Sequence, residues 1–199
     1  MKTRDELDLF DGGAPAPLLP DGFKYQPALI SADDAQQLVG HVEALPFKEF
    51  EFHGYTGKRR VVSFGWRYDF DERELQKVDD VPPFLLPLRD RAAAFAGLVP
   101  GDLQHVLVTE YAPGAAIGWH RDKAAFDEVV GVSLVSPCRF RFRRKQGGAW
   151  QRAAVMLEPR SAYLLAGPAR TEWEHSIPPM DRLRYSITFR RVIESDTQR

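Results

Sequence analysis

A histidine and an aspartate separated by one residue, His120 and Asp122, have the residue types and spacing that suit metal chemistry. On an extended strand both side chains would point to the same side, because alternate residues share a face. One imidazole and one carboxylate are two of the three ligands of the facial triad that holds Fe(II) and leaves coordination positions open. A later histidine would supply the third ligand, and His175 is the only one that follows. The alternative is that the H-x-D spacing arose by chance.

A second chemical pattern lies near the C-terminus, where residues 184–190 alternate between polar and apolar side chains. If this segment is a strand, one face carries Arg184, Ser186, Thr188 and Arg190, and the other carries three apolar residues. Two guanidinium groups on one face suit a small dicarboxylate, because each can form a bidentate ion pair. The alternative is a solvated edge strand that binds nothing.

These patterns occur together with others in a fixed order. The chain reads Y-x-P-G-x-x-I-x-x-H-x-D from Tyr111 to Asp122, then Val132-Ser133-Leu134, then His-Ser-Ile-Pro-Pro from His175, then R-x-S-x-T-x-R. In order and in spacing, these motifs resemble the AlkB family of Fe(II)/2-oxoglutarate-dependent dioxygenases. The resemblance covers roughly residues 103–192.

The resemblance implies an Fe(II) site and a 2-oxoglutarate site. It assigns His120, Asp122 and His175 to Fe(II). The residues that it assigns to 2-oxoglutarate are Arg184 at the distal carboxylate, Arg190 near the carboxylate next to the keto group, and Tyr111. Thr109 and Ser186 stand where the nucleic-acid-repair members usually have asparagine, and both still offer a hydrogen bond to the co-substrate.

The resemblance also implies the reaction. A dioxygenase of this family uses Fe(II), 2-oxoglutarate and O2 to hydroxylate an N-methyl group on a base of alkylated DNA or RNA, and releases formaldehyde, succinate and CO2. The expected function is therefore nucleic-acid repair by demethylation. Ala124 replaces an acidic residue with which repair members often read the flipped base, so base specificity stays open. Two alternatives also stay open: the same chemistry on a methylated protein side chain or small metabolite, and a jelly-roll binding module without catalysis.

Residues 58–70 interleave cations with aromatic rings. Single-stranded nucleic acid is held by such surfaces, because cations meet phosphates and rings stack on bases. The family resemblance places the substrate-recognition lid in this general region. The predicted substrate contacts are Arg59, Arg60, Trp66, Arg67 and Tyr68. The arginines that alternate with phenylalanines in residues 139–143 are further candidates for contact with the nucleic-acid backbone. The alternative is that the rings are core and the cations are solvated.

The remaining chain predicts a mainly β fold with N-terminal helices (α+β). Helical spacing and a capping pattern predict a helix after Ser31 that ends before Pro46, and a second helix over residues 84–96 closed by Gly97. From Leu103 onward short strands and turns follow one another, which indicates a sandwich or barrel. For an AlkB-like protein this implies a double-stranded β-helix, or jelly roll.

Length and composition set the remaining expectations. The 199 residues predict a flexible acidic and Pro/Gly-rich arm over 1–22 and one domain over 23–199. A net charge of -1 argues against a generally basic nucleic-acid binder but allows a local basic patch. One cysteine, Cys138, excludes an internal disulfide framework. With no signal peptide and no apolar run that could span a bilayer, we expect a soluble cytoplasmic monomer without membrane contact.

Overall fold

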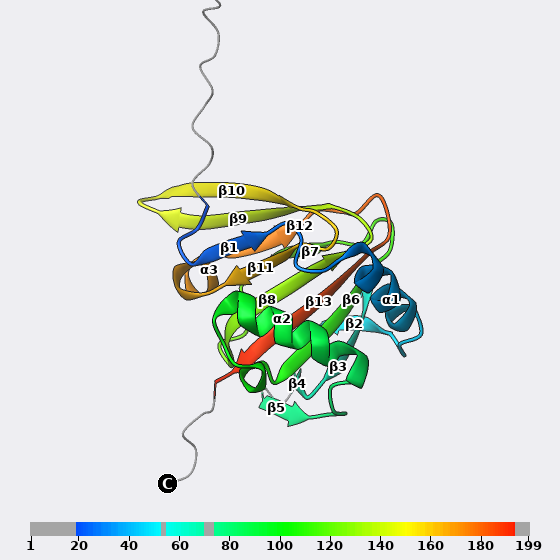
Figure 1. Cartoon of the computed structure of the whole chain (residues 1–199). Helices are drawn as coiled ribbons and strands as arrows, with labels where there is room; N and C mark the ends of the chain where they lie inside the picture. The colour runs from blue at the N-terminus through cyan, green and yellow to red at the C-terminus, as the bar shows by residue number, and fades with distance from the viewer. Residues whose placement is uncertain (1–18, 53–54, 70–73, 194–199) are drawn as a thin grey trace, which may run out of the picture.

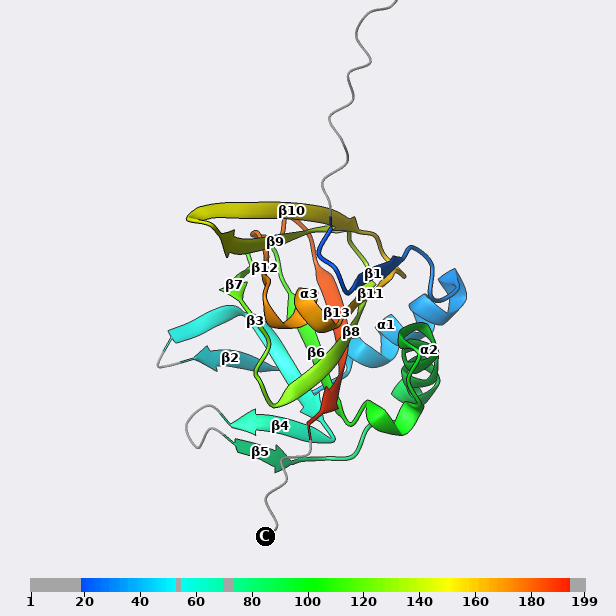
Figure 2. The ribbon, with the colours of Figure 1, turned by 90° about the vertical axis from the view of Figure 1, so that its left-hand side faces the viewer.

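Two antiparallel sheets face each other in the computed structural model, which describes residues 19–52, 55–69 and 74–193. The large sheet has the strand order β1-β11-β8-β13-β6-β3-β2, the small sheet has the order β10-β9-β12-β7, and β4 and β5 form a separate hairpin. The strands are β1 (Phe23–Gln26), β2 (Lys48–Phe52), β3 (Tyr55–Phe64), β4 (Trp66–Asp69), β5 (Glu74–Lys77), β6 (His105–Tyr111), β7 (Ile117–His120), β8 (Phe126–Leu134), β9 (Cys138–Gln146), β10 (Ala149–Leu157), β11 (Ala162–Leu165), β12 (Glu174–Ile177) and β13 (Arg184–Val192). This arrangement, visible in Figures 1 and 2, is the double-stranded β-helix that the sequence predicts.

The two longer helices lie where the sequence predicts, although α2 begins at Leu86, two residues later than expected. Helix α1 (Ala32–Glu43) starts at Ser31, whose Oγ accepts a 3.1 Å hydrogen bond from the Asp34 amide. Helix α2 (Leu86–Ala96) follows the 3-10 turn η1 (Pro83–Leu85) and ends at Gly97, whose φ of 75° is left-handed and favours glycine. Two short elements, η2 (Pro100–Asp102) and α3 (Gly167–Thr171), complete the list. None of the described helices has the length and apolar character needed to cross a membrane.

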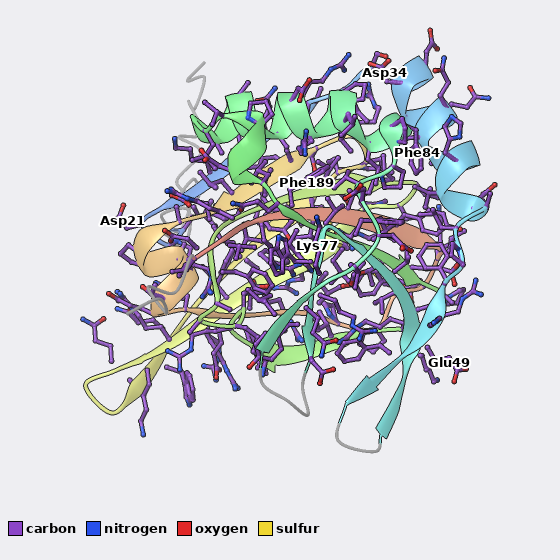
Figure 3. All side chains as sticks on the ribbon, turned by 90° about the horizontal axis from the view of Figure 1, so that it is seen from below. Asp21, Asp34, Glu49, Lys77, Phe84 and Phe189 are labelled. Atoms are coloured by element: carbon purple, nitrogen blue, oxygen red, sulfur yellow. The ribbon has the colours of Figure 1, made fainter. Side chains whose placement is uncertain are left out.

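One apolar core lies between the helices and the outer face of the large sheet. Tyr185, Ile187 and Phe189 of β13 are buried there with residues of α1 and α2. In Figure 3 Phe189 lies between β13 and α2. As predicted, the alternation of β13 separates its apolar and polar residues onto two faces. The structure shows that the apolar face packs on the helices and the polar face borders the space between the sheets.

A second core fills the space between the two sheets. Phe140 and Phe142 of β9 point inward and form an edge-to-face pair with ring centroids 5.0 Å apart. The Phe140 ring also packs 4.8 Å from the ring of Tyr163 on β11. These rings hold the small sheet against the large one and leave a polar pocket between the sheets.

Gly131 on β8 permits the close approach of Tyr163, its partner on β11. A Cβ at this position would lie 2.2 Å from Tyr163 Cζ, inside van der Waals contact. We expect Gly131→Ala to lower the free energy of unfolding by roughly 1–3 kcal/mol, as overpacked cores do, in urea unfolding curves. The control is Gly40→Ala on α1, where a Cβ meets no atom within 4 Å and the helix should gain about 0.5–1 kcal/mol. Equal stability of the Gly131 variant and the parent would contradict the packing described.

Residues 19–22, which the sequence places in the N-terminal arm, are hydrogen-bonded to the folded domain. The carbonyl of Asp21 accepts a 2.8 Å hydrogen bond from the Ala169 amide, and that of Gly22 accepts one of 3.1 Å from Ala166. Residues 19–22 are therefore tied to the end of β11 and to α3 rather than forming part of a loose arm. The rest of the predicted arm, residues 1–18, lies outside the described residues.

Candidate active site

The three predicted metal ligands line one pocket between the sheets. His120 on β7 and His175 on β12 are cross-strand partners, and their ring centroids are 4.3 Å apart. Asp122 lies in the loop just after β7, not on the strand as predicted, because β7 ends at His120. Its Oδ2 is nevertheless 3.7 Å from His175 Nε2. Antiparallel pairing of β7 with β12 thus joins residues that are far apart in the sequence.

Hydrogen bonding and burial hold both imidazoles in the form that a metal requires. His120 Nδ1 is 2.9 Å from the Gly118 carbonyl, so this nitrogen donates and Nε2 keeps its lone pair. Burial lowers the pKa of His120, and burial together with His120 lowers the pKa of His175 to about 3. Burial by itself raises the pKa of Asp122, but Arg190 and the two histidines outweigh it and bring that pKa below its ordinary value. Neutral imidazoles and an ionised carboxylate are the forms that bind metal ions.

The donor set fits Fe(II) in chemistry and nearly in position. Among the described residues, no three His, Cys, Asp or Glu side chains converge on one point at coordination distance. Two ligands about 2 Å from one metal ion and at a right angle stand about 3 Å apart. The 3.7 Å between Asp122 and His175 is only somewhat wider. Two histidines and one carboxylate could therefore hold Fe(II) after a small side-chain adjustment.

A buried arginine lies on the large-sheet side of the two-sheet space. Arg184 is completely buried, its Nε donates a 2.9 Å hydrogen bond to Ser133 Oγ, and its guanidinium carbon is 5.1 Å from the Tyr111 ring centroid. Its two terminal nitrogens have no hydrogen-bond partner among the described residues. A buried guanidinium with two nitrogens unused by the protein is suited to a carboxylate, because the pair forms two parallel hydrogen bonds. The residues present therefore fit 2-oxoglutarate.

Hydroxyl groups and a second arginine extend this polar surface. Thr109, Ser186 and Ser133 are cross-strand neighbours on β6, β13 and β8. Thr109, Ser186 and Tyr111 line the same pocket as the histidines, as does Arg190. Arg190 Nε donates to Asp122 Oδ1 at 2.9 Å, so its ion pair with Asp122 holds that carboxylate. Sequence reasoning assigned no role to Ser133, although a hydroxyl inside an otherwise apolar strand is a usable signal.

Arg170 is a further residue that the sequence does not reveal. It is buried, and its guanidinium donates to the carbonyls of Lys123, Phe126 (2.6 Å) and Asp127 (3.1 Å). These carbonyls belong to the loop and strand that follow Asp122. Arg170 thus fixes the backbone beside the candidate metal centre, and it does so from α3, which contains no recognisable motif.

The two neighbouring arginines of the predicted substrate segment face opposite ways. Arg59 lines the pocket, with its guanidinium carbon 3.8 Å from the Phe50 ring centroid. Arg60 forms a bidentate ion pair with Glu110, at 2.7 and 2.8 Å, away from the pocket. Alternation along β3 is the reason. Arg60 therefore lies outside the pocket wall, whereas Arg59 is part of it.

The other three predicted substrate residues lie on hairpin β4–β5 and do not line the pocket. Arg67 bonds to Gln76 across this hairpin at 3.0 Å. The Tyr68 ring lies 5.2 Å from the Lys123 ammonium, beside the loop after Asp122. Trp66 is half-buried at the start of β4. The hairpin thus lies beside the loop that follows Asp122, but these three residues do not form part of the pocket wall.

The fold and site together define an oxygenase of the double-stranded β-helix type. The chain belongs to the 2OG-Fe(II) oxygenase superfamily, whose family model matches residues 28–190. It is therefore a dioxygenase that uses Fe(II), 2-oxoglutarate and O2.

Curated relatives confirm the resemblance to the AlkB family. The chain is 29% identical over 222 residues to the alpha-ketoglutarate-dependent dioxygenase AlkB of Salmonella typhimurium, an alignment that covers 96% of this chain and 100% of that protein. It is 28% identical over 176 residues to the alkylated DNA repair protein ALKBH8 homolog of Arabidopsis thaliana, which covers 76% of this chain. The chain spans about half, 49%, of the plant protein's length.

Solved structures resemble this one in fold alone, because their sequence identities are low. The structure of OsALKBH1 matches with a TM-score of 0.70 at 17% identity, covering 87% of this chain and 98% of that chain. A Pseudomonas putida prolyl-4-hydroxylase matches with a TM-score of 0.58 at 14% identity, covering 86% and 93%. The fold therefore occurs in proteins with different names and does not by itself determine the substrate.

Proposed function

We propose that this dioxygenase demethylates N-alkylated bases in single-stranded DNA or RNA, as a step of alkylation repair. The observation that carries the proposal is Arg59, a half-buried cation stacked on Phe50 in the wall of the pocket that contains His120 and Asp122. A base must leave its stack to reach such a pocket, and the phosphates beside it need a cation close to the entering nucleotide. The name of the plant relative, an alkylated DNA repair protein, supports the same substrate class.

The site residues take roles that follow from their positions. We assign His120, Asp122 and His175 to Fe(II), and Arg184 with Tyr111 to 2-oxoglutarate. Bound there, Fe(II) with 2-oxoglutarate and O2 would supply the oxidant for insertion of one oxygen atom into a C–H bond of the N-methyl group, with conversion of 2-oxoglutarate to succinate and CO2. The hydroxymethyl group then breaks from nitrogen as formaldehyde, and the nitrogen keeps a proton.

The protein orients these groups and keeps water away from them. Arg190 holds Oδ1 of Asp122, which leaves Oδ2 directed at His175. Apolar side chains complete the wall around the histidines; they include Leu107, Ile117, Val129 and Phe140. Excluding water strengthens the ion pairs of the buried arginines, because charges interact more strongly at low dielectric.

Arg59→Ala tests the assignment of the substrate. We expect it to weaken binding of a methylated single-stranded oligonucleotide and to reduce the log–log salt slope by about 0.7, the value of one phosphate contact. Binding of 2-oxoglutarate should stay unchanged. The control is Arg91→Ala on α2, which removes an equal charge from the helix side, where Arg91 pairs with Asp34.

The assay is formaldehyde release from methylated oligonucleotides, peptides and free nucleosides, combined with a salt titration of oligonucleotide binding. Release from a methylated peptide but from no oligonucleotide would replace the proposal with the protein-side-chain alternative. The protein-side-chain alternative is tested because Ala124 supplies no acidic group that could bind a base. An unchanged salt slope in the Arg59 variant would remove Arg59 from the substrate contacts.

A further inference from the structure

The outer side of the small sheet carries a set of arginines and tryptophans that the candidate active site does not use. Phe140 and Phe142 of β9 point into the core between the sheets, so the alternating arginines point outward. Arg152 of β10 is the cross-strand partner of Arg143. We call this set the arginine–tryptophan face; its members are Trp119, Arg139, Arg141, Arg143, Trp150 and Arg152. In Figures 1 and 2 its strands lie on the side of the molecule opposite α1 and α2.

The rings and cations of this face are already ordered against one another. The guanidinium carbon of Arg143 lies 4.5 Å from the ring centroids of both Trp119 and Trp150. That of Arg141 lies 5.0 Å from Trp119, and its Nε donates a 3.1 Å hydrogen bond to Ser176 Oγ. Cation–π contacts of this kind hold the side chains in place, which lowers the entropy cost of binding a partner.

The face has more positive charge than its own acids neutralise. Glu174, the cross-strand partner of Arg143, pairs with it at 2.5 Å. Arg139 and Arg152 are exposed, and their guanidinium groups make no hydrogen bond or ion pair with any residue in the described ranges. The chain as a whole has a net charge of -1, so this concentration of arginine is local. A polyanion is the partner that matches it.

We propose that the arginine–tryptophan face binds the single strand that continues from the nucleotide held in the pocket, an inference that rests on the proposed function. Rows of cations bind phosphates, and the exposed Trp150, 42% accessible, offers a ring for a base to stack on. An acidic peptide would use the arginines but has no need of the tryptophan rings.

The path from pocket to face is short. Trp119 and His120 are neighbours on β7, and their side chains lie on opposite faces of the small sheet. Strand β7 is the edge strand of that sheet. A nucleic-acid chain leaving the pocket therefore reaches the face by crossing a single edge strand.

The test compares a short and a long strand on matched variants. The first variant is Arg139→Ala/Arg152→Ala, and the second is Trp150→Ala. The control is Lys24→Ala/Arg91→Ala, which removes two charges from the helix side: Lys24 alternates with Phe23 and Tyr25, whose rings pack between the sheets. The strands are a methylated trinucleotide and a single strand of roughly 12 nucleotides, within the usual site sizes of single-strand binders. Urea unfolding of each variant checks that these surface changes leave the fold intact.

For the long strand, the double arginine variant should lower the log–log salt slope by about 1.4, from two lost phosphate contacts. Trp150→Ala should weaken binding roughly five- to a hundredfold with no change of slope, because stacking releases no counterions. Both variants should bind and demethylate the trinucleotide as the parent does. The control variant should equal the parent in binding and demethylation of both strands.

The outcomes separate this inference from the proposed function. If the trinucleotide is demethylated and every variant binds the long strand equally well, the arginine–tryptophan face does not bind the strand. The proposed function would then still hold. If neither strand releases formaldehyde, the proposed function is wrong. If the arginine variant nevertheless shows the expected drop in the salt slope of long-strand binding, the result still supports nucleic-acid binding by the arginine–tryptophan face. Loss of long-strand affinity in the arginine variant alone, with Trp150→Ala equal to the parent, would overturn base stacking on this face and leave its arginines as phosphate contacts.

Discussion

Replacing His175 by alanine is expected to reduce 2-oxoglutarate turnover by more than about a hundredfold. Loss of a residue that only orients a metal ligand typically costs ten- to a hundredfold, and loss of a ligand removes the facial geometry itself. Asp122→Ala should have the same effect, because it removes an anionic donor that faces His175, at 3.7 Å. Succinate formation measures turnover, and competition with an Fe(II) chelator under anaerobic conditions measures metal affinity. Both quantities should fall together.

The control for this prediction is His41→Ala. His41 lies on α1, with its ring 4.9 Å from the Phe84 ring. The large sheet separates α1 from the pocket. This variant should keep parental turnover and iron affinity. If His175→Ala retained full turnover at the iron concentration that saturates the parent, His175 would have to leave the ligand set and the β7–β12 pairing would serve packing alone.

The second large effect is expected at Arg184. Arg184→Met should abolish measurable 2-oxoglutarate binding, and Arg184→Lys should weaken it about ten- to a hundredfold, since a lost charged hydrogen bond is worth roughly 1.5–3 kcal/mol. Lysine keeps the charge but cannot form the bidentate pair. Calorimetric titration of 2-oxoglutarate into the anaerobic protein gives both affinities.

Stability separates a ligand role of Arg184 from a structural one. The guanidinium is fully buried, and its terminal nitrogens bond to no residue in the described part of the chain. A buried charge without such partners is unfavourable, so Arg184→Met should leave the ligand-free protein no less stable in urea than the parent. The control is Arg182→Met, an exposed position that should change neither quantity. A large loss of stability in Arg184→Met with unchanged 2-oxoglutarate affinity would make Arg184 a packing residue.

Local patterns in the sequence predicted much of the architecture. The alternation of β13 predicted that Tyr185, Ile187 and Phe189 share one face of a strand, and the structure confirms this, since all three are buried in the core with the helices. The Ser31 cap and the Gly97 end of the helices were also predicted correctly. Such features are readable because a strand repeats every two residues, a helix repeats every 3.6, and caps act over three or four positions.

Patterns of the same kind do not show which side chains line the pocket when the partner of a side chain lies far away in the sequence. Arg59 and Arg60 are adjacent and chemically alike, and both were predicted to contact substrate. Pairing of β3 with β6 makes Arg60 the partner of Glu110 and directs Arg59 to the pocket. Nothing within a few residues of either arginine distinguishes them, because the acid that binds Arg60 is on another strand.

The amino-acid sequence by itself thus determined which segments form strands and helices, and it contains the H-x-D and R-x-S-x-T-x-R motifs. The assembled sheets decided which of these residues meet. Arg59 and Arg184 both have Tyr111 as their cross-strand partner, on β3, β13 and β6. Their proximity comes from sheet register, and register is set by burying whole faces of many strands at once, not by any local segment.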